Sequence, residues 1–517
     1  MRDIDRLCES YFDLLWHFDP AAASAAGSVS WDGQLGRFDA EAMRTHLAAL
    51  RATAAALEEM DIEGLADEID RTALLDDARA TIARLDEDRP PARDPGFWLG
   101  HLRDALASLL LRPEDPASAG QRARAAGERI AGIPEFLSSA RSVLRQLPVF
   151  LMDGALATLG PLGELLVQTA LTFGPAAPGG PEALNQSVAV ALQSLAGFGH
   201  WLRSETKPAP DVTASVLGTA RFERRLNHRF AVRSSAAELA RYAARLMTET
   251  EAALTAQAAA LGSEGGWRGA LARVEQGRTD PLPVMREEIA RVRGLLTERA
   301  VVPVPAAGPD LIALPPPLVP LLPGIVYLPV AGQLAVAPAR RSRFAVPALV
   351  AAYALPGRHL LEIAAGSTGS LVRRRLRSPV MVDGWSLYAE ELAEDLAPSA
   401  AKEARLLRLA RLLRAAARLA ADVGIHTLGM APVDAVTLLS GRAGVDPARA
   451  EAEVRRIVAR PTDAGAAAIG RREILALRSA AGASPGDTDA LARFHDALLA
   501  FGALPPGLAA WGLGIDR

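Results

Sequence analysis

Cysteine is almost absent from this sequence of 517 residues, in which Cys8 is the single example. One thiol excludes an internal disulfide bond, and it also excludes a metal or redox site of the C-x-x-C type. Because a lone cysteine usually packs as a small apolar side chain, we expect Cys8 to be buried on the first helix.

The sequence also lacks a strong net charge. Its 57 basic and 60 acidic residues give a formal charge of -3, and the basic residues are spread along the chain rather than blocked. A general positive field that would attract nucleic acid or an anionic membrane is therefore missing, and we predict no nucleic-acid partner.

Long uncharged hydrophobic runs are missing as well. The most apolar segment, 147–173, contains Asp153 and Glu164, so we interpret it as core helices rather than a membrane span. The first residues read Met-Arg-Asp-Ile-Asp-Arg, with acidic residues where a signal peptide needs a basic start and an apolar run. We therefore expect a cytoplasmic protein with no membrane partner.

Helix-forming sequence dominates what remains. Ala, Leu, Arg and Glu recur with apolar residues three and four apart, for example in 119–144 and 402–423, which predicts a mainly α fold. The exception is 301–340, which is rich in proline and nearly uncharged. Its β-forming residues around 325–330 favour a small β-sheet or an extended segment lining a cleft, although a semi-rigid linker is the alternative.

The domain organisation follows from this pattern. We predict one continuous region over 1–517, in which 1–300 is a helical N-terminal part and 301–340 is the proline-rich segment. The remaining residues, 341–517, carry the motif described next and the C-terminal helices.

Two short stretches carry the strongest functional signal, and they read Pro-Gly-Arg-His at 356–359 and Asp-Gly-Trp-Ser-Leu-Tyr-Ala-Glu at 383–390. A zinc peptidase needs two ligands on one helix, a third on the next helix, and a glutamate that takes a proton from the metal-bound water. The spacing of Asp383, Ser386 and Glu390 by three and four places them on one helix face.

These stretches resemble the signature of the bacterial domain-of-unknown-function family 885, a gluzincin-like group distantly similar to metallopeptidases such as angiotensin-converting enzyme and carboxypeptidase Taq. The family signature is His-Glu-x-x-Pro-Gly-His-His, followed by Glu-Gly-Trp-x-Leu-Tyr-x-Glu. The resemblance extends from Asp19-Pro20 to Pro505 and includes Arg418, Asp422 and His426. It implies a zincin-like helical shell around a deep cleft, with zinc as the cofactor.

The departures from the signature fall on the metal site. Ala352 and Tyr353 stand where the family has its first zinc histidine and its general-base glutamate. Arg358 replaces one of the paired histidines, and Asp383 replaces the glutamate expected as the third ligand. Because a guanidinium does not deprotonate and repels a dication, His359 with one aspartate forms a poor zinc site. We therefore expect no bound cofactor and no zinc-dependent hydrolysis.

Three functions stay open at this point. The first is a pseudo-peptidase that binds a peptide or small molecule, in which Arg358 fills the zinc position and pairs with Asp383. The second is a metal-independent enzyme that uses general acid-base chemistry. The third is a structural protein that forms a homodimer or a complex with an active relative. The candidate catalytic residues are His359, Asp383, Tyr353, Tyr388 and His426, and the candidate ligand-binding residues are Arg358, Glu390 and Trp385.

Overall fold

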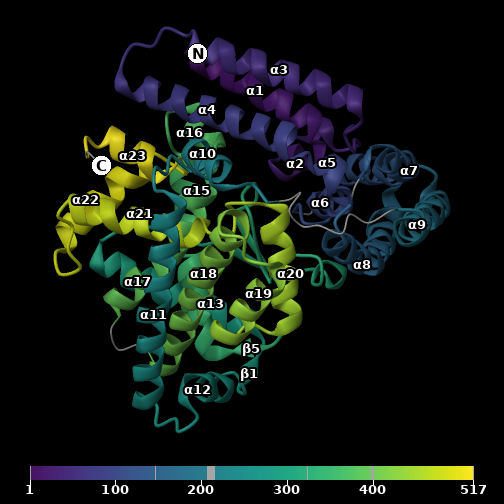
Figure 1. Ribbon diagram of the computed structural model, residues 1–517. Coiled ribbons are helices and arrows are strands. Elements are labelled where there is room, and N and C mark those ends of the chain that lie inside the picture. Colours follow the sequence, from purple (N-terminus) through teal and green to yellow (C-terminus); the bar gives the residue numbers. More distant parts are fainter. Residues whose placement is uncertain are drawn as a thin grey trace. The chain divides into compact units, whose positions relative to one another are not determined.

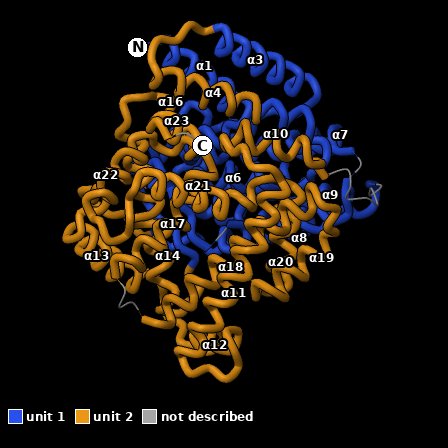
Figure 2. Tube along the Cα trace, turned by 60° about the vertical axis from the view of Figure 1, so that its left-hand side comes forward, with its two compact units in different colours: residues 1–59, 81–214, 312–337 blue, residues 60–80, 215–311, 338–517 orange. Residues whose placement is uncertain are grey.

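A computed structural model describes residues 2–113, 115–145, 147–206, 216–322, 324–397 and 401–515. Helices make up most of it, and the prediction of a mainly α protein with a small β component is confirmed (Figure 1). The chain forms two compact units, which Figure 2 colours separately. Unit 1 comprises residues 1–59, 81–214 and 312–337, and unit 2 comprises residues 60–80, 215–311 and 338–517.

Unit 1 consists mainly of helices from the first two fifths of the chain. Several begin at an aspartate whose side chain accepts backbone N–H groups of the first turn, as Asp39 and Asp94 do. Its core holds Phe38, Trp98 and Phe136 in edge-to-face contacts. The helices are α1 (Asp3–Phe18), α2 (Pro20–Ala25), α3 (Ala40–Glu58), α5 (Pro90–Arg93), α6 (Pro95–Leu110), α7 (Ala119–Val143), α8 (Val149–Phe173) and α9 (Gly180–Ser204).

Cys8 is buried on α1, as expected. Two helical stretches, Val149–Ala176 and Arg343–Gly366, are long and apolar enough to cross a membrane by length and composition alone. The first of them contains α8, which contributes Leu162 and Leu165 to the core of unit 1. A core position for one face of α8 agrees with the interpretation of 147–173 as core helices.

The proline-rich segment contains the strands predicted for it. A three-stranded sheet has the order β2 (Asp310–Ala313), β4 (Gln333–Val336), β3 (Ile325–Leu328). Strands β3 and β4 are antiparallel, with Ile325 opposite Val336 and Leu328 opposite Gln333. None of the three strands contains a proline, so the prolines flank the ladder and cost it no hydrogen bond.

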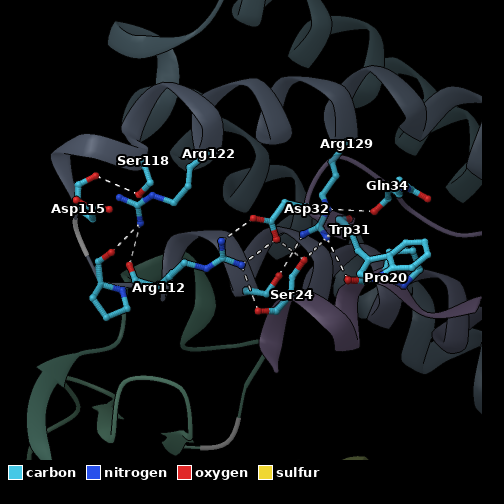
Figure 3. Close-up of polar contacts among 12 residues, drawn as sticks. Pro20, Ser24, Trp31, Asp32, Gln34, Arg112, Asp115, Ser118, Arg122 and Arg129 are labelled. Atoms are coloured by element: carbon cyan, nitrogen blue, oxygen red, sulfur yellow. Dashed lines mark hydrogen bonds and ion pairs between the residues drawn. The ribbon is translucent and has the colours of Figure 1, made fainter. Parts of the chain in front are cut away.

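A buried polar network ties four elements of unit 1 together around Arg129 on α7 (Figure 3). Arg129 is fully buried and donates to Ser24 Oγ at 2.7 Å, to Ser108 Oγ and to the backbone carbonyls of Pro20, Trp31, Gln34 and Ala105. Beside it, Arg112 binds both carboxylate oxygens of Asp32, at 2.5 and 2.8 Å. Burial lowers the pKa of Arg129 to about 10, and the surrounding acceptors satisfy its donors.

Unit 2 contains the remaining helices and a two-stranded antiparallel ladder of β1 (Arg278–Thr279) and β5 (Arg341–Ser342). Its long helices α11 and α18 pack against each other, as do α17 and α21. The helices are α4 (Leu65–Ala83, whose last turn belongs to unit 1), α10 (Thr219–Phe230), α11 (Ala236–Ala260), α12 (Gly266–Val274), α13 (Pro281–Arg299), α14 (Val346–Tyr353), α15 (Arg358–Gly366), α16 (Leu371–Arg375), α17 (Pro379–Leu396), α18 (Lys402–Thr427), α19 (Pro432–Thr437), α20 (Pro447–Ala459), α21 (Ala466–Ala480), α22 (Thr488–Leu499) and α23 (Pro506–Gly512).

The crossing of α17 and α21 explains the glycine of the second motif. A Cβ atom on Gly384 would lie 2.5 Å from the backbone of Gly470, and one on Gly470 would lie 1.8 Å from the carbonyl oxygen of Val380. No side chain fits at either position, so the two helices touch through their backbones. This contact fixes the position of α17, which carries four of the eight candidate site residues.

Candidate functional site

The two motif stretches meet through Trp385. Its indole Nε1 donates to the carbonyl oxygens of Pro356, at 2.9 Å, and Gly357, at 3.2 Å, and the side chain is fully buried. Trp385 therefore holds the connection between α14 and α15 against α17. Trp385 was predicted to bind a ligand, but no part of its ring is exposed to water. It can therefore affect a ligand only by positioning the connection between α14 and α15.

Tyr388, one turn further along α17, belongs to a buried hydrogen-bonded chain. Its hydroxyl lies 2.7 Å from His495 Nε2, and His495 Nδ1 lies 2.7 Å from the carbonyl oxygen of Val301. Burial lowers the pKa of His495 to about 4 and raises the pKa of Tyr388 to about 12, so both are neutral near pH 7. The neutral imidazole donates from Nδ1 to the carbonyl and accepts from Tyr388 at Nε2.

His426 is also completely buried, at the end of α18. Its Nε2 lies 3.0 Å from the carbonyl oxygen of Ile457 and 3.8 Å from Asp422 Oδ1. Asp422 accepts the backbone N–H groups of Thr462 and Gly465, while burial raises its pKa to about 7. Asp422 and His426 thus attach the loop before α21 to α18.

His359 and Asp383, the two residues left from the zinc signature, have different neighbours. His359 is buried with its Nε2 3.3 Å from the carbonyl oxygen of Ala307, and burial lowers its pKa. Asp383 is exposed to water, yet the dense surroundings of its carboxylate raise its pKa against the opposing charges of Arg358 and Arg418. The exposure limits that rise, because water reaches and solvates the carboxylate.

Arg358 begins α15 and lies near the carboxylate of Glu362. Its Nε is 3.5 Å from Glu362 Oε1, and Arg377 binds the other oxygen of Glu362 at 2.6 Å. The positive charge of Arg358 also opposes the rise in the pKa of Asp383, and an ion pair between the two residues stays a prediction. Arg358 therefore brings a fixed positive charge to the position where the family signature has a histidine.

Tyr353, at the end of α14, faces the arginines of α18. Its hydroxyl lies beside the guanidinium of Arg411, which binds both carboxylate oxygens of Glu390 at 2.7 to 3.1 Å. Glu390 is buried, so its charge depends on this ion pair. Two turns after Arg411 on α18, Arg418 binds Glu453 of α20 through two contacts of 2.6 and 2.7 Å. Glu390, predicted to bind ligand, is thus committed to Arg411.

The donor set does not fit a zinc ion of the kind that the signature implies. Among the residues that the structure describes, no three His, Cys, Asp or Glu side chains are grouped so that they could hold a metal. Ala352 has no donor atom, and Arg358 adds a positive charge where a neutral ligand is needed. No step of a mechanism can therefore be derived through zinc.

The sequence interpretation overlooked two parts of this region. His495, the partner of Tyr388, lies 107 residues away, and no local spacing connects the two. The arginines at 411, 414 and 418 were visible as a run with spacings of three and four, which places them on one face of α18. That pattern is the signal that could have found them.

Solved structures with the same fold come from two organisms. A protein of Shewanella oneidensis described as a "putative lipoprotein of unknown function" aligns with a TM-score of 0.76 at 17% identity, covering 99% of this chain and 100% of its own. A protein of Colwellia psychrerythraea described as "the putative lipoprotein" aligns with a TM-score of 0.80 at 17% identity, covering 99% of this chain and 98% of its own. At this identity the likeness shows the fold.

The family follows from the sequence match. The chain belongs to the family described as "Bacterial protein of unknown function (DUF885)", whose model matches residues 20–510. No curated protein matches the chain. The resemblance drawn from the two motif stretches is thereby confirmed at the level of the family.

The expectation of a cytoplasmic protein is wrong by these comparisons. Both similar structures are of proteins described as putative lipoproteins, a description that points, for those proteins, to a membrane-anchored or secreted location rather than a cytoplasmic one. The expectation depended on the first residues of the sequence, which have acidic side chains where a signal peptide needs a basic start and an apolar run.

Proposed function

We propose that this protein is a non-hydrolytic member of its family, a pseudo-peptidase that binds a peptide or small molecule where metallopeptidase relatives of the signature hold zinc. The observation that carries the proposal is that metal-binding groups of the signature are missing while guanidinium groups lie in their region. Arg358 occupies a histidine position of the signature, and Tyr353, at the general-base position, lies beside Arg411. A region built around guanidinium groups favours anions and repels Zn²⁺.

The alternative of a metal-independent enzyme has less support. General acid-base chemistry needs groups within reach of a substrate proton. Tyr388 and His426 are fully buried and are bonded to His495 and Ile457. Of the five candidate catalytic residues, Asp383 is exposed and Tyr353 is half-buried, and neither is paired with a histidine base.

Metal content and hydrolysis test this function together. Purified protein incubated with Zn²⁺ and desalted is expected to retain much less than one zinc per chain, and peptide cleavage is expected to be the same with and without a chelator. Asp383→Ala and His359→Ala should leave the zinc content unchanged. One zinc per chain that is lost in both variants, together with chelator-sensitive cleavage, would overturn the proposal.

A ligand-binding arm completes the test. Thermal shift measurements with a panel of dipeptides and small carboxylic acids should find compounds that raise the melting temperature of the wild-type chain. A compound that binds at this region should lose its effect in Arg358→Gln. The matched control is Arg374→Gln, whose guanidinium donates to the carbonyl oxygen of Thr368 on the surface.

A further inference from the structure

Arginine side chains from three elements of unit 2 gather at one face of α18. Arg411, Arg414 and Arg418 share that face through their spacing of three and four residues. Helix α18 packs against α20, which carries Arg449, and against the short turn Arg343–Ala345 that follows Arg341. We call Arg341, Arg411, Arg414, Arg418 and Arg449 the arginine cluster.

Two members of the cluster have their own carboxylates. Arg411 is bound to Glu390 and Arg418 to Glu453, each through both carboxylate oxygens. Glu453 interacts with two more arginines, because Arg456 lies 4.0 Å from its carboxylate and the charge of Arg449 lowers its pKa. The carboxylates of Glu390 and Glu453 are thus committed to arginines that already hold them.

Arg414 is different, since it lies between Arg411 and Arg418 without a bound carboxylate. It makes no hydrogen bond and no ion pair with any other residue that the structure describes, and its Nε is buried. The guanidinium of Arg449 likewise makes neither contact within the described part of the chain. Both side chains keep some exposure to water, so a dissolved ligand can reach them.

Two members of the cluster, Arg341 and Arg414, have surroundings that disfavour their positive charge. Burial lowers the pKa of Arg414, and the positive charges of Arg418, Arg411 and Arg449 lower it further, against the opposing charge of Glu275. Burial also lowers the pKa of Arg341, as do the charges of Arg449 and Arg411. Guanidinium groups held together, of which Arg414 and Arg449 have unused donors among the described residues, provide a site for negative charge.

We propose that Arg341, Arg414 and Arg449 bind a small anionic ligand that carries two or more phosphate or carboxylate groups. The planar guanidinium group matches both kinds of oxyanion with two parallel N–H donors, and several such groups together favour a ligand with several charges. The hydroxyl of Tyr353 beside Arg411 supplies a further polar contact at the edge of the cluster. This inference rests on the proposed function and names the chemical class of its ligand.

Calorimetric titration of the full chain with pyrophosphate, citrate and inorganic phosphate tests the site, in a phosphate-free buffer at low salt. We expect pyrophosphate or citrate to bind and inorganic phosphate to bind at least tenfold more weakly. Arg414→Gln and Arg449→Gln should each weaken the tightest ligand at least tenfold. Binding of pyrophosphate alone identifies a phosphoryl ligand, and binding of citrate alone identifies a carboxylate ligand.

Arg405→Gln is the matched control because it removes the same charge from the same helix. Arg405 lies nine residues before Arg414, about two and a half turns and therefore on the opposite face, where its Nε is 3.1 Å from Glu394. The control should bind like the wild type. Absence of binding by any of the three anions, or equal loss in Arg405→Gln and Arg414→Gln, would overturn the inference.

The test of the anion site and the test of the proposed function can fail independently of each other. Zinc content and chelator-sensitive cleavage decide the proposed function without reference to Arg414. Stoichiometric zinc with anion binding lost only in Arg414→Gln and Arg449→Gln would overturn the proposed function and leave the anion site standing. Circular dichroism of each variant shows whether a loss of binding reflects unfolding, and Arg414→Lys, which keeps the charge, should recover part of the affinity if the site is folded.

Discussion

Arg129 in unit 1 and Arg414 in unit 2 are the same side chain in opposite surroundings. Arg129 is fully buried, and its donors meet two serine hydroxyls and four backbone carbonyls. Arg414 is only partly buried, has arginines on both sides, and makes no hydrogen bond within the described chain. The two arginines differ most in how many hydrogen-bond acceptors surround the guanidinium group. An arginine whose donors are all used stabilises the fold, and one with unused donors is available to a ligand.

The difference has a physical basis in desolvation. Removing a charge from water costs several kcal/mol, and a protein recovers that cost through hydrogen bonds and opposite charges. The network around Arg129 supplies both kinds of contact. The arginine cluster supplies them for Arg411 and Arg418 and leaves Arg414 and Arg449 to water or to a bound anion.

The largest effect is expected from Arg129→Met. It removes the buried donor to two serine hydroxyls and four backbone carbonyls, so the free energy of unfolding should fall by about 4 to 5 kcal/mol. Urea denaturation measures the change. Arg124→Met, at an exposed position on the same helix, should change stability by less than about 0.5 kcal/mol. Similar losses of stability in Arg129→Met and Arg124→Met would show that the buried contacts of Arg129 do not stabilise unit 1.

The next largest effect is expected from Arg411→Met, which leaves the buried Glu390 without its cation. Stability should fall by about 3 to 4 kcal/mol. Glu390→Gln in the same chain should recover more than half of the loss, since it removes the unpaired charge. A double-mutant cycle from urea denaturation gives the coupling energy, and a coupling near zero would show that the pair contributes nothing.

Acid should destabilise unit 2 through His495, which resembles Arg129 in having partners on all its donors and acceptors. Burial lowers its pKa from 6.5 to about 4, so its contribution to stability is complete above pH 6.5 and is lost as the pH falls towards 4. We expect a loss of about 2 to 3 kcal/mol over this range. Urea midpoints at pH 7, 5.5 and 4.5 should fall more steeply for the wild type than for His495→Gln, and parallel curves would contradict the assignment.

The smallest effect is expected from Arg414→Met. Without a bound anion it removes repulsion from Arg411 and Arg418, so stability should rise slightly or change by less than about 1 kcal/mol. Thermal and urea unfolding in a low-salt, phosphate-free buffer measure this. A loss as large as that of Arg129→Met would show that Arg414 is a structural residue, and the distinction between the two arginines would fail.

The fold could be predicted from the sequence because its signals are local. Apolar spacing of three and four marked the helices of 119–144 and 402–423, and the β-forming residues Ile325 to Tyr327 marked β3 between flanking prolines. The family could also be predicted, because its motif residues stand close together in the chain.

The site could be predicted only in part. The sequence identified Tyr388 and Trp385 as candidates, but their burial and their bonds to His495 and Pro356 depend on contacts between distant segments. Periodicity alone would have placed Arg411, Arg414 and Arg418 on one face. Which of them has a carboxylate depends on Glu390 and Glu453, which come from α17 and α20.

The contact between Gly384 and Gly470 has a consequence for how such proteins are recognised. Any side chain at either position would push α17 away from α21, whatever reaction or ligand the region serves. Gly384 allows α17 and α21 to pack closely, and Trp385 binds the connection between α14 and α15 to α17, so both residues stabilise the scaffold. A sequence search that finds Gly-Trp therefore detects how two helices are joined, and the presence of this signature is no measure of whether a chain can cut peptides.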